Sequence, residues 1–160
     1  MGAVARRALL LVALTLLAAC SPGPVEVDLD EPEKADVAPC RRLIDDVPDE
    51  VADQQRRDTD PANALAAAWG DPAIVLSCGL PAPRLSATAS CLTVAGVDWY
   101  LPDDEVAAPG EEQGTVTITS IGREQTVVVE LPGDYWPPAT ALADLSPVVK
   151  KDIAATARCE

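Results

Sequence analysis

Apolar and polar residues alternate most regularly in the second half of the chain. Residues 115–119 alternate strictly between threonine and an aliphatic side chain, and residues 126–131 are rich in β-branched side chains. Both patterns favour β-strands, and the short segment 121–124 between them contains a glycine. We therefore predict an antiparallel β-hairpin from these two segments. Two further runs, residues 73–78 and 91–94, predict strands on similar grounds, and residues 97–100 either extend the second of these strands or begin another.

Helices are predicted from capping residues and from the positions of prolines. Residues 41–47 are a short candidate helix that ends before Pro48, because the residue before a proline avoids the helical conformation. Asp60 and Pro61 are of the types preferred at the N-cap and at the first position of a helix. The alanine-rich run 62–69 is therefore predicted to be helical.

The C-terminal region repeats the signature of a cap followed by proline. Ser146 and Pro147 predict the start of another helix, and the residues after them place an apolar stripe on one of its faces: Val148, Val149, Ile153 and Ala157. With helices at both ends and antiparallel strands between them, the predicted fold class is α+β, a small antiparallel sheet in a single domain of residues 40–160.

The N-terminus has the parts of a bacterial export signal. Arg6 and Arg7 form a basic start, and residues 8–19 are uncharged, with Thr15 as their one polar side chain. This apolar run is shorter than the roughly 20 residues that a transmembrane helix needs. Residues 1–19 are therefore predicted to be a signal peptide that is removed on export.

The end of this leader places a cysteine after small side chains. Leu17, Ala18, Ala19 and Cys20 are typical of a lipobox, in which the cysteine sulfur receives diacylglycerol and the new N-terminus often an acyl chain such as palmitate. Two or three chains make a stable anchor, whereas one chain holds only marginally. The competing interpretation is an ordinary cleaved signal, with Cys20 in the mature chain by chance. We predict a lipoprotein on the extracytoplasmic face of the cell membrane.

Residues 20–39 are predicted to be an acidic tether between this anchor and the domain. Residues 21–39 contain six acids, one lysine and four prolines, and have little to bury. Fully extended, they would span about 60 Å. The whole chain has a formal net charge of −14, and cleavage would make it −16, because the leader holds two arginines and no acid. Such a charge argues against nucleic acid and anionic lipid surfaces as partners.

Four cysteines remain if Cys20 carries the lipid, namely Cys40, Cys78, Cys91 and Cys159. An even number in an exported protein indicates disulfide bonds. Of the three connectivities that four cysteines allow, we favour Cys78–Cys91, which flank a proline-rich turn, and Cys40–Cys159, which would join the two ends of the domain. A zinc site is the alternative, but the chain has no histidine and no C-x-x-C motif.

Several short motifs in the middle of the chain form a set. They are W-G-D-P at residues 69–72, I-V-L at 74–76, C-G at 78–79, V-D-W at 97–99 and G-R at 122–123. On these motifs the chain resembles the actinobacterial envelope lipoproteins of domain of unknown function family 3515, over roughly residues 40–131. The resemblance implies a secreted or lipid-anchored envelope protein. It brings no activity and no catalytic residue with it.

The W-G-D-P segment is the first candidate for an interaction site. If a helix ends at Trp69 and Gly70, Asp71 is presented at the edge of the following strand. The simpler interpretation places Trp69 in the core and lets Asp71 cap local backbone amides. We favour the simpler interpretation, because structural turns are commoner than binding sites.

The five aromatic residues of the chain are candidates for a platform that binds a sugar ring or a peptide. Because phenylalanine is absent, Trp69 and Trp99 are the largest side chains available to the core, and we expect them to be buried. Tyr135 and Trp136, which are flanked by an acid and two prolines, are expected on the surface. Tyr100 would complete the platform.

Charged residues raise two further hypotheses. Asp98 and the acids at 103–105 lie near an aromatic pair, as glycoside hydrolysis would require. The simpler interpretation is a solvated acidic loop, since the sequence has no calcium-binding loop motif, no histidine and no G-x-S-x-G elbow. Arg123, on the predicted hairpin tip, would contact an anionic partner or, more simply, would be a solvated turn residue.

Taken together, the patterns favour a lipid-anchored cell-envelope protein without cofactor, metal or catalytic residues. We expect a non-catalytic module that binds a protein partner or a cell-wall component. The alternative is a small envelope hydrolase that uses Asp71 or Asp98.

Overall fold

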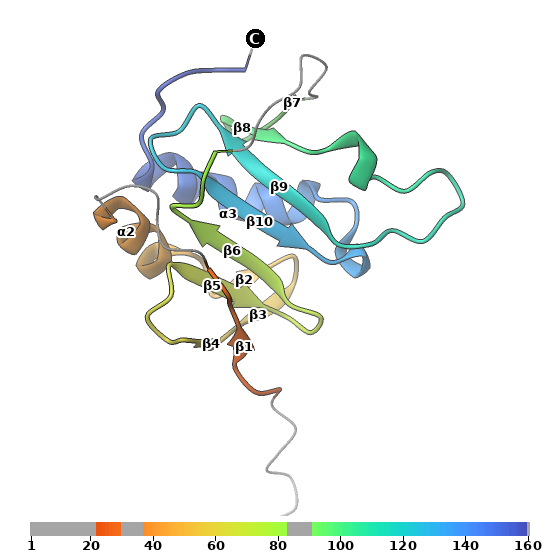
Figure 1. Ribbon diagram of the computed structural model, residues 1–160, viewed down its shortest axis with the longest axis horizontal. Helices are drawn as coiled ribbons and strands as arrows, with labels where there is room; N and C mark the ends of the chain where they lie inside the picture. The colour runs from red at the N-terminus through yellow and green to blue at the C-terminus, as the bar shows by residue number, and fades with distance from the viewer. Residues whose placement is uncertain (1–21, 30–36, 83–90, 160) are drawn as a thin grey trace, which may run out of the picture.

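A computed structural model describes residues 22–29, 37–82 and 91–159 (Figure 1). The predicted leader and Cys20 lie outside these ranges. The helices and strands, in chain order, are β1 (Val25–Glu26), α2 (Ala38–Asp46), β2 (Glu50–Val51), β3 (Gln54–Arg57), β4 (Thr59–Asp60), β5 (Ala66–Trp69), β6 (Ile74–Cys78), β7 (Cys91–Val94), β8 (Val97–Tyr100), η2 (Asp103–Glu105), β9 (Val116–Ile121), β10 (Val127–Leu131), η3 (Gly133–Tyr135) and α3 (Ala139–Asp152).

The described strands form one large sheet and one small one. The large sheet has eight strands in the order β2-β3-β5-β6-β10-β9-β8-β7, and its pairings are antiparallel. Strands β1 and β4 pair in parallel as a separate two-stranded sheet. With two α-helices beside an antiparallel sheet in the described ranges, the chain has the α+β fold that the sequence predicts.

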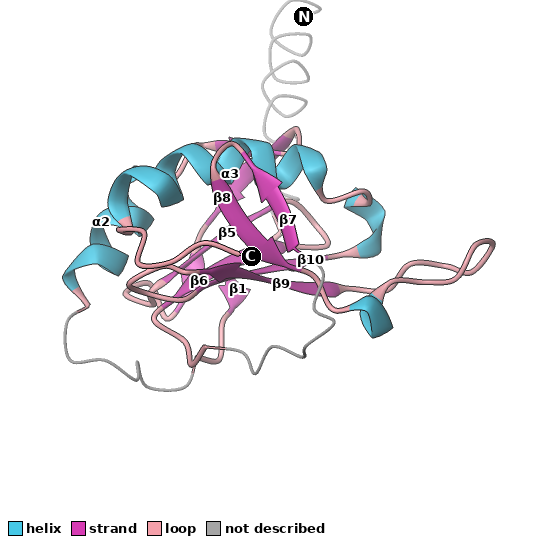
Figure 2. Cartoon of the chain, turned by 90° about the horizontal axis from the view of Figure 1, so that it is seen from above, coloured by secondary structure: helices cyan, strands magenta, loops and turns pink. Residues whose placement is uncertain are grey.

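Helices α2 and α3 cover the same face of the large sheet (Figure 2). The side chains on that face are apolar because they pack against the helices. A row of paired residues across β5, β6, β10 and β9 illustrates this: Ala67, Leu76, Val129 and Ile118 are each at most 1% exposed. Each large aliphatic side chain that is fully buried in this way stabilises the fold by about 1.5–3 kcal/mol before the entropy of ordering is subtracted.

The clearest sequence patterns are confirmed. The predicted hairpin is β9 and β10, which pair over residues 116–119 and 128–131. The runs 73–78 and 91–94 correspond to β6 and β7, and residues 97–100 form a separate strand, β8. The helix predicted at 41–47 is α2, which begins three residues earlier and has Pro39 in its first turn, where a missing N–H costs nothing.

The helix predicted at 62–69 is wrong, because Ala66–Trp69 is strand β5. All four residues of β5 are buried, and the strand lies between β3 and β6. Its small alanines are buried on both faces of the sheet, whereas a surface helix needs one polar face. Tertiary packing here overrides the intrinsic preference of alanine for helices.

The start predicted for the C-terminal helix is also wrong. Helix α3 begins at Ala139, so Pro147 lies inside it, and the helix ends at Asp152. Ser146 is not an N-cap; its buried hydroxyl accepts a hydrogen bond from the indole N–H of Trp99 at 3.0 Å. Ala157 lies beyond the helix and is exposed, whereas Ile153 directly after the helix is fully buried.

The predicted cysteine pairing is wrong, although all four cysteines form disulfide bonds. Cys40 on α2 is bonded to Cys78 at the end of β6, and Cys91 on β7 to Cys159 near the C-terminus. A Cys78–Cys91 bond is excluded by the sheet, because three strands separate β6 from β7. At about 4.8 Å per strand the two cysteines are roughly 19 Å apart, against a limit of about 7 Å between bonded Cα atoms.

None of the helices in the described ranges has the length and the apolar character that crossing a bilayer requires.

Candidate functional site at the W-G-D-P turn

The W-G-D-P motif forms the tight connection between β5 and β6. Trp69 and Ile74 are the last cross-strand pair, and Gly70 begins the turn with a φ of +75°. A side chain at Gly70 would also meet neighbouring atoms, because a Cβ would lie 2.7 Å from the Tyr135 hydroxyl and 2.9 Å from Cγ of Gln54. Glycine is therefore required here both for its backbone conformation and for the close approach.

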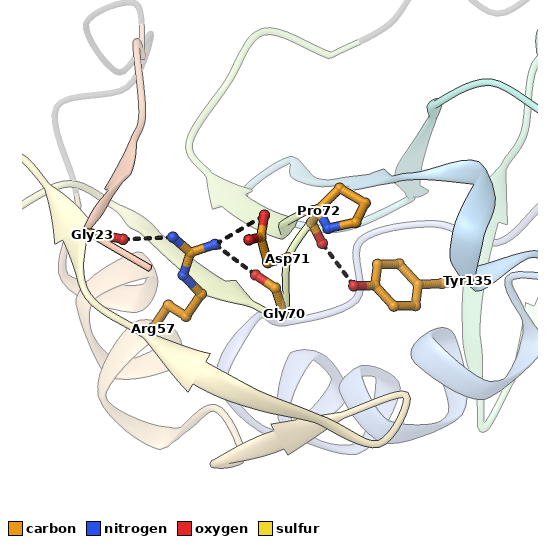
Figure 3. A network of polar contacts seen from close by, with 6 residues as sticks. All are labelled: Gly23, Arg57, Gly70, Asp71, Pro72 and Tyr135. Atoms are coloured by element: carbon orange, nitrogen blue, oxygen red, sulfur yellow. Dashed lines mark hydrogen bonds and ion pairs between the residues drawn. The ribbon is translucent and has the colours of Figure 1, made fainter. Parts of the chain in front are cut away.

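Arg57 on β3 holds this turn from one side (Figure 3). Its Nη1 donates a hydrogen bond of 2.7 Å to the carbonyl of Gly70 and lies 3.9 Å from a carboxylate oxygen of Asp71. Its Nη2 donates to the carbonyl of Gly23, which belongs to residues 22–29, here called the N-terminal strap. The Arg57 side chain is only 16% exposed. One guanidinium thus joins β3, the turn and the strap.

Tyr135 on η3 holds the turn from the other side, where its hydroxyl donates a hydrogen bond of 2.8 Å to the carbonyl of Pro72 (Figure 3). Burial, and to a smaller extent the nearby Asp134 carboxylate, raises the pKa of Tyr135 above its ordinary value, so the phenol stays protonated and can donate. The expectation that Tyr135 and Trp136 are exposed is wrong. Both are half-buried and pack against the core, because Tyr135 is needed to support the turn.

Asp71 presents the charged group of this turn to solvent, with a side chain that is 73% exposed. It borders an open hollow of about 580 Å³, which is lined by residues 22–24 of the strap, residues 53–58 and Gly70. The hollow combines three carboxylates with two guanidinium groups: Asp53, Asp58, Asp71, Arg56 and Arg57. The turn is therefore fixed through its backbone, while the carboxylate at its tip is free to meet a partner.

The other aromatic candidates do not join Asp71 in a platform. Trp69 and Trp99 are fully buried, as predicted. The indole N–H of Trp69 donates to the carbonyl of Pro48 at 2.9 Å, and that of Trp99 to Ser146. Both rings have their polar atom satisfied inside the core, which identifies them as structural residues.

Asp98 on β8 has a structural role. It is 8% exposed and accepts hydrogen bonds from the hydroxyl of Thr93 at 2.7 Å and from the backbone N–H of Cys159 at 3.1 Å. The Thr93 hydrogen bond and the Cys159 amide lower the pKa of Asp98. A carboxylate that is held ionised in this way fixes the chain next to the Cys91–Cys159 disulfide.

The remaining acids of the hydrolase hypothesis are not brought to the turn. Asp103 and Asp104 are exposed on η2, while Glu105 accepts a hydrogen bond from the backbone N–H of Thr117. Asp98 lies on β8, three places in the sheet from β6, the strand that begins after Asp71, with β10 and β9 in between. Asp71 and Asp98 therefore line no common pocket of the part of the chain that the structure describes.

Replacing Asp98 by asparagine should lower the free energy of unfolding by about 1–2 kcal/mol at neutral pH, because a charged acceptor is lost. The pKa of Asp98 is lowered from 3.8 in the folded protein, so its stabilisation is complete above pH 5 and is lost as the pH falls through the lowered value. In urea denaturation, the difference between wild type and D98N should narrow progressively below about pH 4. The exposed Asp104→Asn is the control, and a difference that does not change with pH would contradict this role of Asp98.

Arg123 is neither a solvated turn residue nor a free contact for an anion. Its two Nη atoms donate hydrogen bonds of 2.9 Å to the carbonyls of Ile153 and Gly96. Its backbone also forms an isolated bridge with Ala155. Arg123 thus ties the β9–β10 connection to the C-terminal segment and to the β7–β8 turn.

Among the described residues, no group of three or more histidine, cysteine or acidic side chains is arranged to hold a metal ion.

Two features of this site were missed in the sequence. The first is Arg57, which has no motif of its own and gains its role only when β3 pairs with β5. The second is the strap, where Val25, Val27 and Leu29 are half-buried while Glu26 and Asp28 are exposed. The strict alternation of aliphatic and acidic residues from 25 to 30 is the signal of a half-buried strand, and the acidic composition of the tether obscured it.

Comparison with known proteins gives one result that bears on identity. Neither the curated proteins nor the solved structures yield a match to this chain. A family model described as "Protein of unknown function (DUF3515)" matches residues 2–157. That match extends over nearly the whole chain, including the W-G-D-P turn and three of the four disulfide-bonded cysteines, Cys40, Cys78 and Cys91. The chain therefore belongs to the DUF3515 family.

Proposed function

We propose that this protein is a lipid-anchored interaction module on the extracytoplasmic face of the cell membrane, and that Asp71 presents the contact to its partner. The anchor is inferred from the lipobox at residues 17–20. The binding role rests on one observation, which is the exposed carboxylate of Asp71 on a turn that Arg57 and Tyr135 hold rigid. A rigid turn supports recognition because it loses little conformational freedom when a partner binds.

The partner of this surface is a protein with a basic group. The whole chain has a formal net charge of −14, which attracts cationic surfaces over a distance and repels anionic ones. Asp71 supplies the local contact, since its carboxylate lies 3.9 Å from Arg57 and retains most of its exposure to solvent. A cell-wall component would have to offer a positive group to fit the same surface.

The geometry does not support hydrolysis by Asp71 and Asp98 acting as a pair. Two-carboxylate hydrolysis requires a pair of acids about 5–10 Å apart around one substrate. Asp98 is occupied by Thr93 and Cys159, and Asp71 lies at a distant part of the sheet.

Replacing Asp71 by asparagine should reduce capture of the partner by about two- to fivefold, the range expected for one exposed charge pair. The measurement is photo-crosslinking in intact cells, with the crosslinking amino acid in place of Gln55, an exposed residue that lines the same hollow. Asp104→Asn removes the same charge from a distant exposed position and should leave the yield unchanged. Equal yields for D71N and wild type would contradict the role of Asp71.

The anchor has its own test. Mass spectrometry of the protein from its membranes should find an N-terminus at Cys20 that carries diacylglycerol. An unacylated N-terminus at any other residue would contradict the proposed location.

A further inference from the structure

The N-terminal strap is docked on the domain by a small set of contacts. The backbone N–H of Val25 donates to the carbonyl of Asp58 at 2.8 Å, and that of Val27 to the carbonyl of Asp60 at 2.9 Å. Arg57 adds the hydrogen bond to Gly23. These contacts run along β4 and the end of β3, on the face of the sheet opposite to the helices (Figure 1).

The side chains of the strap pack only partly against the domain. Val27 and Leu29 line two hollows, one of about 400 Å³ beside α2 and one of about 220 Å³ over Val75 and Val128. Val25, Val27 and Leu29 remain half-buried. A segment with few hydrogen bonds and incomplete packing opens at a low free energy compared with the core of the same domain.

The position of the strap determines which part of the domain lies near the anchor. Cys20 precedes Pro22 by two residues, which span at most about 7 Å. Pro22 and Gly23 line the same hollow as Asp71. If Cys20 carries the lipid, the docked strap keeps the hollow beside the W-G-D-P turn close to the bilayer.

We infer that the N-terminal strap is a releasable clamp that orients the domain, so that the docked state presents the W-G-D-P turn to the membrane surface. This inference rests on the proposed lipid anchor at Cys20. The partner that meets Asp71 is then a basic protein segment at the bilayer surface and not a component of the outer cell wall.

Release of the strap changes both the distance of the domain from the membrane and the orientation of the domain relative to it. From Cys20 to the start of α2 the freed chain has about 17 residues and extends to roughly 60 Å. In the docked state the opposite edge of the sheet points away from the membrane, because β3 and β7 are six strand positions apart, or about 29 Å along the sheet. Figure 1 shows β1 and β7 at opposite ends of the molecule.

The orientation is tested with the acylated full-length protein in phosphatidylcholine vesicles that contain a headgroup nitroxide quencher. A fluorescent amino acid replaces either Asp58, next to the strap, or Leu92, an exposed residue of β7. The probe at position 58 should be quenched more strongly than the probe at position 92. Equal quenching on acylated protein would overturn the inference while leaving the anchor intact.

The strap itself is tested by a matched pair of double variants. Val25→Thr with Val27→Thr keeps the shape of the half-buried side chains but makes them polar, whereas Glu26→Gln with Asp28→Asn changes the exposed positions of the same segment. The threonine pair should speed hydrogen exchange at the amides of residues 25 and 27 by about tenfold and abolish the quenching difference. The control pair should leave both measurements unchanged.

Two results separate this inference from the proposed function. Unprotected amides at residues 25 and 27 in the wild-type protein would overturn the strap, whether or not a lipid is present. Mass spectrometry that finds no lipid on Cys20 would overturn the proposed function and, with it, the orientation.

Discussion

Replacing both Cys40 and Cys78 by alanine should lower the free energy of unfolding by about 4–5 kcal/mol. The bond closes a loop with a sequence separation of 38 residues, for which chain entropy alone gives about 4 kcal/mol. Both cysteines are also buried, with exposures of 0% and 2%, so truncation leaves a cavity between α2 and β6. Urea denaturation of a fragment of residues 22–160 measures the loss directly.

The second disulfide provides the comparison. Cys91 and Cys159 close a longer loop, with a separation of 68 residues, but Cys91 is exposed and Cys159 is half-buried. Chain entropy predicts a slightly larger loss of unfolding free energy when Cys91 and Cys159 are replaced, whereas burial predicts a larger loss when Cys40 and Cys78 are replaced. We expect burial to decide the order. A smaller loss for C40A/C78A than for C91A/C159A would show that loop length dominates.

The sequence predicts the parts of this fold that are encoded locally. The hairpin of β9 and β10 is predictable because the alternation of Val116, Ile118 and their polar neighbours matches the two faces of a strand. Strand β6 is predictable because a short apolar run between a Gly-Asp-Pro turn and a Cys-Gly pair is typical of a strand that is buried on both faces. Neither prediction needs knowledge of what lies beside the strand.

Non-local relations account for the errors. Residues 66–69 have the composition of a helix and become β5 only because β3 and β6 lie on either side of them. Pro147 has the sequence context of the first residue of a helix, yet it lies inside α3. The turns of α3 that precede Pro147 are held by packing, because Leu142 and Leu145 are buried in the core. The cysteine pairs depend on a strand order in which β7 is far from β6, and no local pattern specifies that order.

The residues of the candidate site likewise divide into those that a local sequence motif reveals and those that only the folded chain brings together. Asp71 is visible in the sequence because it belongs to a compact motif. Its supports are not, since Arg57, Tyr135 and Gly23 come from three separate segments and meet only in the folded chain (Figure 3).

Replacing Trp69 by alanine should lower the free energy of unfolding by about 3–5 kcal/mol, because a fully buried indole leaves a large cavity beneath the turn. Trp69→Phe should cost less, about 1–2 kcal/mol, mainly because the carbonyl of Pro48 loses its hydrogen-bond donor. Trp99→Phe is the matched control, since it removes an equally buried indole whose N–H donates to Ser146, away from the turn.

The two phenylalanine variants separate a structural tryptophan from one that binds a partner. If Trp69 acts only by packing, W69F and W99F should lower the free energy of unfolding by similar amounts. Neither variant should then lower the crosslinking yield from position 55 by more than its fraction of unfolded protein accounts for. A fall in yield for W69F alone, at the same stability as W99F, would assign Trp69 to the contact surface. We expect the first result, because the Trp69 ring is 0% exposed, whereas the Asp71 side chain is 73% exposed.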